Sequence, residues 1–438
     1  MKRILVLIGC FSLAIVSPHE TAFALVKWKQ TPLLVYSADG RKIATCTDRG
    51  NIRLWDAESG QKFGADIEAP DAAAAFVFSE DGSTLVVASD CPADYSNVKD
   101  SLFFSTAMQV TTWSTATGRQ INKSPVFNGI GSTECRLGPG GRLFGVTLLN
   151  GDVQLWDVAA MKVRGTGVSG LNTRVEWDML FSPDEKRVLV TGGSGKMLLM
   201  DCDSGEVTGN VMLYAEQPPD TFPISIYSYA FSQDGTLVYA LGEYHAVLRA
   251  WNSKDATPAA IAPSILQYRG SALSPNGRYM LSKDNQGNAR LVDLKLDSHK
   301  NTVVERQDTD PKESGHRANC ISNNGKAMLQ DDTGLVVYDF LTGKQRAEIA
   351  WNKYFAGESA YAWRIPHLNR TEDWMIVFSR KEKTAVLCNL SSANQQITKI
   401  NRAGAIAFSP DGRKFAVTTD GTDLKTYECA AAVRELSH

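Results

Sequence analysis

The sequence of 438 residues contains only six histidines and has no surplus of basic charge. Lys and Arg together number 46, Asp and Glu number 48, and the formal net charge is -2. A chain so close to neutrality lacks the positive field that non-specific nucleic-acid binding requires, so we expect no nucleic-acid partner. The histidines are scattered and no Gly-x-Ser-x-Gly signature appears. We therefore expect no catalytic residue, metal or cofactor.

Long apolar runs are also missing, except at the start of the chain. Residues 4–16 are almost wholly apolar, follow two basic residues, and precede an Ala-Phe-Ala sequence that ends at Ala24. The run is shorter than the roughly 20 residues that span a bilayer. We expect residues 1–24 to be a signal peptide cleaved after Ala24, residues 25–438 to form one periplasmic or secreted domain, and no integral membrane segment. Cys10 resembles a lipoprotein cysteine but lies within the apolar run, which argues against lipid anchoring.

Nine copies of one strand-turn-strand pattern fill the rest of the chain. Each copy has an apolar strand, a tight turn, a second strand, a Gly- or Asp-rich turn and a third strand. The copies span residues 33–56, 75–114, 135–157, 179–201, 229–252, 271–293, 319–339, 362–389 and 406–428. Asp-Gly, Asn-Gly and Gly-Gly pairs supply the positive φ that tight hairpins need. With one short strand between copies, each unit has four antiparallel strands, which is typical of a β-propeller blade.

These motifs resemble the WD-repeat β-propeller family. The Trp-Asp pair recurs at Trp55-Asp56 and Trp156-Asp157, and a Ser-Pro-Asp-Gly turn occupies residues 409–412. The resemblance covers essentially the whole chain after residue 24 and implies a propeller, a fold that hosts many unrelated activities. The sequence departs from the family in lacking the Gly-His pair that normally opens each repeat.

We predict a single all-β propeller of nine four-stranded blades, with eight blades as the alternative. The eighth copy is the weakest, because its first turn at residues 367–371 lacks a glycine. The last copy ends after its third strand, and residues 26–29 precede the first copy. We predict that this N-terminal strand completes the last blade and closes the ring, which hides an edge that would otherwise pair with other chains.

The first strand of each copy places two kinds of residue in register. Bulky apolar residues stand just before the turn, at Tyr36, Phe78, Leu137, Phe181, Phe231, Leu273, Ile321, Ile365 and Phe408. Three residues earlier the side chains are mostly small, but Glu134 and Asp178 break this rule in adjacent blades. We expect these carboxylates to lie close together at the channel mouth, beside Arg136. An ion pair with Arg136, a bound cation and a catalytic acid pair are the three interpretations.

Three insertions fall on one face of the predicted ring. In a four-stranded meander, the second-to-third turn and the crossover to the next blade emerge at the same end. Residues 90–108 expand such a turn, and residues 206–227 and 348–360 expand crossovers. Their aromatic side chains are candidates for a protein-binding rim: Tyr95, Phe103, Phe104, Tyr214, Phe222, Tyr227, Trp351, Tyr354 and Phe355. The alternative is that these aromatics pack the loops onto the blades.

Cleavage after Ala24 would leave seven cysteines, an odd number. Cys91 and Cys135 should lie at the same face of neighbouring blades. An exported location would permit a disulfide between them, and this pair is the candidate disulfide.

The leading functional hypothesis is a non-enzymatic, exported scaffold that binds a protein or peptide across the insertion-bearing face. The alternative is a propeller enzyme or a binder of a metal or small ligand, such as a hydrolase or a quinoprotein-like dehydrogenase. That alternative would use Glu134 and Asp178 at the channel mouth.

Overall fold

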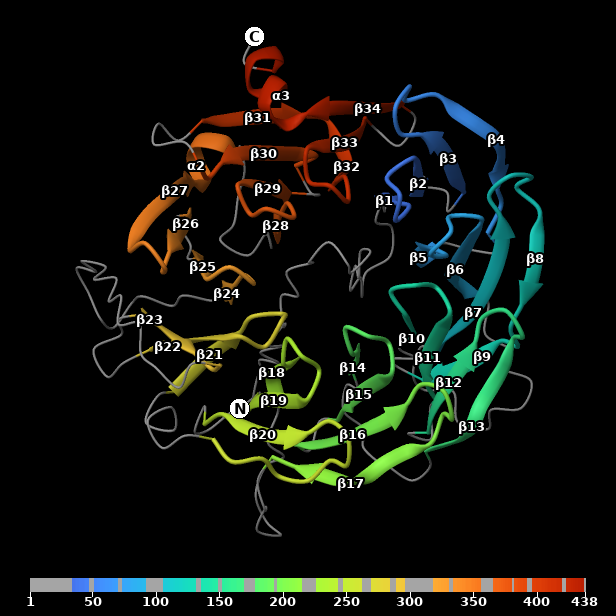
Figure 1. Ribbon diagram of the computed structural model, residues 1–438. Helices are drawn as coiled ribbons and strands as arrows, with labels where there is room; N and C mark the ends of the chain where they lie inside the picture. The colour runs from blue at the N-terminus through green and yellow to red at the C-terminus, as the bar shows by residue number, and fades with distance from the viewer. Residues whose placement is uncertain are drawn as a thin grey trace, which may run out of the picture.

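Nine antiparallel sheets form a ring in the computed structural model (Figure 1). The structure describes residues 34–46, 51–69, 73–91, 105–130, 135–148, 152–168, 178–192, 195–214, 226–242, 247–261, 269–283, 289–295, 318–330, 334–355, 365–379, 382–391, 396–419 and 423–436. Strands that follow one another along the chain are neighbours in each sheet, except that the last strand of blade two, β9, pairs with β7. The predicted nine-bladed, all-β propeller is confirmed.

The first five blades follow the predicted strand order. Blade one contains β1 (Leu34–Tyr36), β2 (Lys42–Cys46), β3 (Ile52–Asp56) and β4 (Lys62–Ile67). Blade two contains β5 (Ala73–Phe78), β6 (Thr84–Cys91), β7 (Ser105–Ser114), β8 (Gln120–Lys123) and β9 (Phe127–Ile130). Blade three contains β10 (Cys135–Leu137), β11 (Leu143–Thr147), β12 (Val153–Asp157) and β13 (Lys162–Val168). Blade four contains β14 (Asp178–Phe181), β15 (Arg187–Thr191), β16 (Lys196–Asp201) and β17 (Val207–Leu213), and blade five contains β18 (Ile226–Phe231), β19 (Leu237–Gly242) and β20 (Arg249–Asn252).

The last four blades complete the ring and include both described helices. Blade six contains β21 (Arg269–Leu273), β22 (Tyr279–Lys283) and β23 (Ala289–Asp293). Blade seven contains β24 (Ala318–Ile321), β25 (Lys326–Gln330), β26 (Gly334–Asp339) and β27 (Lys344–Ala350), followed by α2 (Trp351–Tyr354). Blade eight contains β28 (Ile365–Leu368), β29 (Trp374–Ser379), β30 (Thr384–Asn389) and β31 (Ile397–Asn401). Blade nine contains β32 (Ala403–Phe408), β33 (Lys414–Thr419) and β34 (Asp423–Glu428), followed by α3 (Cys429–Glu435).

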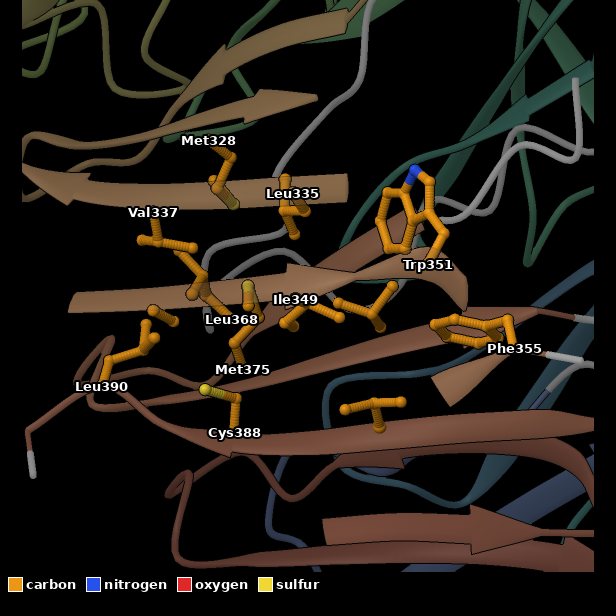
Figure 2. Packing of buried hydrophobic residues seen from close by; sticks show 13 residues of the cluster. Met328, Leu335, Val337, Ile349, Trp351, Phe355, Leu368, Met375, Cys388 and Leu390 are labelled. Carbon is orange, nitrogen blue, oxygen red and sulfur yellow. The ribbon is translucent and has the colours of Figure 1, made fainter. Parts of the chain in front are cut away.

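The hydrophobic core is divided into layers between neighbouring blades. Successive side chains of a strand point to opposite faces, so each sheet gives one set of residues to each neighbour. Figure 2 shows the layer between blades seven and eight, where Leu335 and Val337 of β26 meet Met375 of β29 and Cys388 of β30. Each of these four side chains is at most 1% exposed. The ring is therefore held together by contacts between blades as well as by the hydrogen bonds within them.

Blade eight is a regular blade, although its sequence is the weakest copy. Asn369 takes the place of the turn serine, because its N–H bonds to the Trp374 carbonyl and its side chain accepts from the Trp374 N–H, both at 3.0 Å. Glu372 takes the place of the turn glycine with a φ of 56°. Leu368 therefore fills the bulky position before the turn, and the assignment of Ile365 to that position was wrong by three residues. The sequence placed this turn at residues 367–371, but the turn begins at Asn369. The bulky position just before it is therefore Leu368.

Several devices protect the outer edges of the blades. Bulges interrupt the pairing of β4, β13 and β17 with the strands inside them, and bulges discourage pairing with foreign strands. The outer strand β31 pairs regularly with β30, and α3 packs against it. The predicted closing strand at residues 26–29 lies outside the described residues. Neither described helix has the length and apolar character needed to cross a membrane.

Blade two extends beyond its neighbours on the insertion-bearing face. Its second strand, β6, has 8 residues and its third, β7, has 10, whereas β11 and β12 of blade three have 5 each. The hairpin continues to the pair Cys91 and Ala107, and β9 adds a strand beside residues 105–108. Both ends of the predicted 90–108 insertion, residues 90–91 and 105–108, therefore continue the sheet.

Candidate functional site

Three inner strands bring Arg136, Asp178 and Tyr229 together. Arg136 lies on β10 of blade three, Asp178 begins β14 of blade four, and Tyr229 lies on β18 of blade five. Arg136 Nε donates to Asp178 Oδ1 at 2.9 Å, and the Tyr229 hydroxyl donates to Asp178 Oδ2. The Met179 N–H also donates to Asp178 Oδ1 at 2.9 Å. One carboxylate thus joins three consecutive blades near the axis of the ring.

Burial sets the electrostatics of this cluster. The Arg136 side chain is 11% exposed and that of Asp178 is 27% exposed, so the ion pair is screened less than one at the surface. Burial raises the pKa of Tyr229 well above 10, and the negative charge of Asp178 adds to that effect. Tyr229 therefore stays protonated at neutral pH and acts as a hydrogen-bond donor to Asp178.

Arg136, Asp178 and Tyr229 form a polar link between blades three, four and five, which we call the clasp. Both oxygens of Asp178 already accept hydrogen bonds from protein groups. Glu134, the other predicted carboxylate of the cluster, lies outside the described residues. Among the described residues there is no group of three His, Cys, Asp or Glu side chains that could hold a metal ion. The described part of the cluster therefore supports the ion-pair interpretation of Arg136 and Asp178.

Several of the predicted rim aromatics are core residues. Tyr214, Trp351 and Phe355 are 4%, 6% and 3% exposed, so their assignment to an exposed binding rim was wrong. Trp351 and Phe355 pack edge to face at the end of the layer shown in Figure 2, and the Tyr214 hydroxyl donates to the Val247 carbonyl. These aromatics anchor the start of a crossover to the blades, as the alternative interpretation expected.

The other rim candidates divide into two groups. Tyr354 is partly buried against the same layer, with Lys353 Nζ 5.3 Å from the centre of its ring. Four further residues lie outside the described ranges, and Tyr227 lies in β18 with a side chain that is not described. The four are Tyr95, Phe103, Phe104 and Phe222.

The candidate disulfide is not formed. Cys135 has a free thiol and packs against the apolar layer between blades two and three, while the side chain of Cys91 is not described. Burial raises the pKa of the Cys135 thiol to about 12. The thiol is therefore neutral and behaves as a small apolar core group.

The first turns of neighbouring blades are joined by contacts that the sequence analysis missed. Five blades have an Asp at the third turn position that accepts a hydrogen bond from the turn serine: Asp39, Asp81, Asp184, Asp234 and Asp411. Blades three, six and seven have Gly140, Asn276 and Asn324 there. In each of these three, the backbone N–H at that position donates to a side chain of the following blade.

Two of these inter-blade acceptors are glutamates at a position that otherwise has glycine. Glu185 accepts from the Gly140 N–H, and Glu372 accepts from the Asn324 N–H at 3.2 Å. Both glutamates have positive φ, 52° and 56°, where the seven other blades have glycine. The sequence does contain a signal for these contacts. In both cases the first turn of one blade lacks the usual Asp, and the first turn of the following blade has Glu where Gly is usual.

Comparisons with known proteins agree with the geometry. Residues 33–56 match the family described as WD domain, G-beta repeat. The fold is similar to that of the computationally designed Ika8 protein, with a TM-score of 0.50, 13% identity, and coverage of 95% of this chain and 99% of that chain. The C-terminal WD40 domain of Sif2 is also similar, with a TM-score of 0.48, 11% identity, and coverage of 90% and 95%. No curated protein sequence matches this one.

The ring of meander sheets and the matched first repeat define the class of this protein. It is a β-propeller, and its first repeat matches the WD-repeat family that its Trp-Asp pairs and turns suggested. Propellers of this type commonly serve as scaffolds for protein interactions.

Proposed function

We propose that this protein is a non-enzymatic, exported scaffold that binds a protein or peptide through the insertion-bearing face. The observation that carries the proposal is the extension of blade two, where β6 and β7 stay paired as far as Cys91 and Ala107 and β9 pairs with residues 105–108, so that the strands at both ends of segment 92–104 are firmly held. Binding residues are commonly found on loops that a rigid sheet positions. The signal-like residues 1–24 support export.

The alternative function was an enzyme or a metal site at the channel mouth. The described residues of that cluster do not favour it. Asp178, its described carboxylate, has both oxygens engaged by Arg136 and Tyr229. A carboxylate held in this way stabilises the contact between blades. We therefore assign the Arg136, Asp178 and Tyr229 cluster a structural role.

The experiment is cross-linking of the exported protein followed by mass-spectrometric identification of its partners. In the test variant, residues 92–104 are replaced by a short Gly/Ser linker that leaves Ser105 free to pair with Ile130. The matched control replaces residues 58–60, in the exposed turn between β3 and β4 at the opposite end of blade one, with Gly/Ser residues. Recovery of a specific protein with the wild type and the control, but not with the test variant, is the expected result.

Two other results would count against the proposal. Equal recovery with both variants would show that the blade-two loop is not the binding element. Recovery of a chain that still begins at Met1 would contradict cleavage after Ala24, and N-terminal sequencing of the exported protein measures this directly.

A further inference from the structure

Two carboxylates of blade four bind blade three at the inner strands and at the first turns. Arg136 Nε donates to Asp178 Oδ1 at 2.9 Å, and the Gly140 N–H donates to the Glu185 carboxylate. In both contacts blade three supplies the donor and blade four supplies the charged acceptor. Hydrogen bonds to an ionised group are stronger than those between neutral groups. The inner part of this junction is therefore firmly held.

Two more carboxylates of blade four bind blade three near the outside of the ring. Asp203 Oδ1 lies 3.3 Å from Arg142 Nη1, and Glu206 accepts from the N–H and the hydroxyl of Thr166, both at 3.0 Å. Arg164 Nη1 also donates to the Asp203 carbonyl oxygen at 3.1 Å. Polar contacts thus join blades three and four from the inner strands to the outer strands.

Glycines let the outer parts of blades three, four and five approach closely. A Cβ atom on Gly205 would lie 2.0 Å from the Arg164 carbonyl oxygen, and one on Gly209 would lie 1.9 Å from the Asp255 carbonyl oxygen. Such distances are far below van der Waals contact, so this close packing of the backbones depends on glycine. The clasp adds a contact between blades four and five at the inner strands. Blade four, which lies between the other two in the ring (Figure 1), is therefore fastened to both neighbours.

The junction between blades seven and eight is a useful comparison. The polar contacts that the structure describes there centre on one carboxylate, that of Glu372. It accepts from the Asn324 N–H at 3.2 Å and from the Ser322 hydroxyl. Its other partner is Lys326 Nζ, at 3.7 Å. A junction with fewer contacts needs less free energy to open locally.

We propose that four carboxylates of blade four form a latch, which makes blades three, four and five one rigid sector of the ring. The latch consists of Asp178, Glu185, Asp203 and Glu206. Separating blade three from blade four breaks the contacts of the latch together with the apolar layer beneath them. Separating blade seven from blade eight breaks the contacts of Glu372 and one apolar layer. The ring therefore opens between blades seven and eight before it opens within the sector, whatever the protein binds.

Two buried cysteines report the opening of these two junctions. Cys202 lies in the layer between blades three and four, and Cys388 lies in the layer between blades seven and eight. Both residues are 0% exposed, and burial raises the pKa of each thiol to about 12. A buried neutral thiol does not react with a disulfide reagent, so labelling at neutral pH requires the layer to open. The two thiols are therefore matched probes.

The experiment labels the folded, purified chain with a disulfide reagent and identifies the labelled cysteine by mass spectrometry over time. Cys202 should react at least about tenfold more slowly than Cys388. The double variant Asp178→Ala, Glu206→Ala should raise the labelling rate of Cys202 by at least about tenfold and leave that of Cys388 unchanged. Glu372→Ala is the matched control, which should accelerate the labelling of Cys388 alone. Circular dichroism checks that each variant is folded.

Three results would overturn the proposal. Equal labelling rates in the wild type would show that the ring opens as a whole, and faster labelling of Cys202 would place the weaker junction inside the sector. An unchanged rate for Cys202 in the double variant would show that the carboxylates do not hold the junction. If the double variant does not fold, Glu206→Ala alone makes the same test, because it removes only the exposed contacts with Thr166. The wild-type comparison needs no substitution.

Discussion

The carboxylate of Glu372 in blade eight accepts a hydrogen bond from the Asn324 N–H of blade seven at 3.2 Å. It also accepts from the Ser322 hydroxyl and lies 3.7 Å from Lys326 Nζ. The Glu372 residue is only 5% exposed, and burial raises the pKa of its carboxyl despite these partners. Glu372 therefore occupies a turn position where other blades have glycine, and its carboxylate links blade eight to blade seven.

Removing this carboxylate should loosen the contact between blades seven and eight. Glu372→Ala leaves the buried Ser322 hydroxyl and the Asn324 N–H without this acceptor, so we expect the free energy of unfolding to fall by about 1–3 kcal/mol. Glu372→Gln keeps an acceptor and should lose less. Chemical denaturation measures both, and Glu185→Ala supplies the equivalent change between blades three and four. An unfolding free energy unchanged in Glu372→Ala would show that the contact contributes nothing.

A second prediction concerns the buried hydroxyl of Tyr36. Its side chain is 5% exposed, and the hydroxyl oxygen has no hydrogen-bond partner among the described residues. Burial also raises its pKa above 10. Tyr36→Phe removes an unsatisfied polar group, so we expect the free energy of unfolding to rise by about 1 kcal/mol.

The matched control for Tyr36 is Tyr214→Phe. The Tyr214 hydroxyl is also in the core but donates to the Val247 carbonyl, so its removal should lower the free energy of unfolding. The two substitutions are chemically identical and should have opposite signs in thermal or denaturant unfolding. A loss of stability in both would show that the Tyr36 hydroxyl has a stabilising role.

The sequence predicted the ring well because its signals are local and repeated. In the turn at Asp39-Gly40, the hairpin is fixed by the positive φ of Gly40 and by a hydrogen bond from Ser37 to Asp39. Similar turn residues recur along the sequence, so each repeat can be recognised on its own. Contacts between blades are different, because they join residues about 45 positions apart. The link from Gly140 to Glu185 and that from Asn324 to Glu372 are of this kind.

The rim residues show a second limit of the sequence. Trp351 and Phe355 fall in a crossover by position, and position alone predicted exposure. Their large apolar surface instead fills the end of the layer between blades seven and eight. An aromatic residue in an insertion can serve binding or packing equally well, and the choice depends on whether a cavity exists beside it.

A third prediction separates the clasp from a metal site. Asp178→Asn removes the charge that pairs with Arg136 but leaves an acceptor for Tyr229, so we expect the free energy of unfolding to fall by about 1–3 kcal/mol. Treatment of the wild type with EDTA should leave its melting temperature unchanged, and the variant should have the same metal content as the wild type. Elemental analysis and differential scanning calorimetry measure these quantities. A stoichiometric metal that the variant loses would contradict the structural role.

The last prediction concerns acid stability and His367 on the inner strand β28. The His367 ring is partly buried, and burial lowers its pKa from 6.5 to about 4. Well above pH 6.5 the imidazole is neutral in both the folded and the unfolded state and contributes no pH dependence. Between pH 6.5 and about 4, the unfolded state binds the proton more readily, so the free energy of unfolding should fall, by roughly 2–3 kcal/mol in total.

The variant His367→Gln isolates this effect from the other titrating groups. Glutamine has no titration in this range, so the difference between the two pH profiles reports His367 alone. Glu372 acts in the opposite direction, because a carboxyl with a raised pKa gains a proton more readily in the folded state. Denaturant unfolding from pH 7.5 to 4 measures both profiles. If they stay parallel across that range, His367 has an ordinary pKa and is solvated in the folded ring.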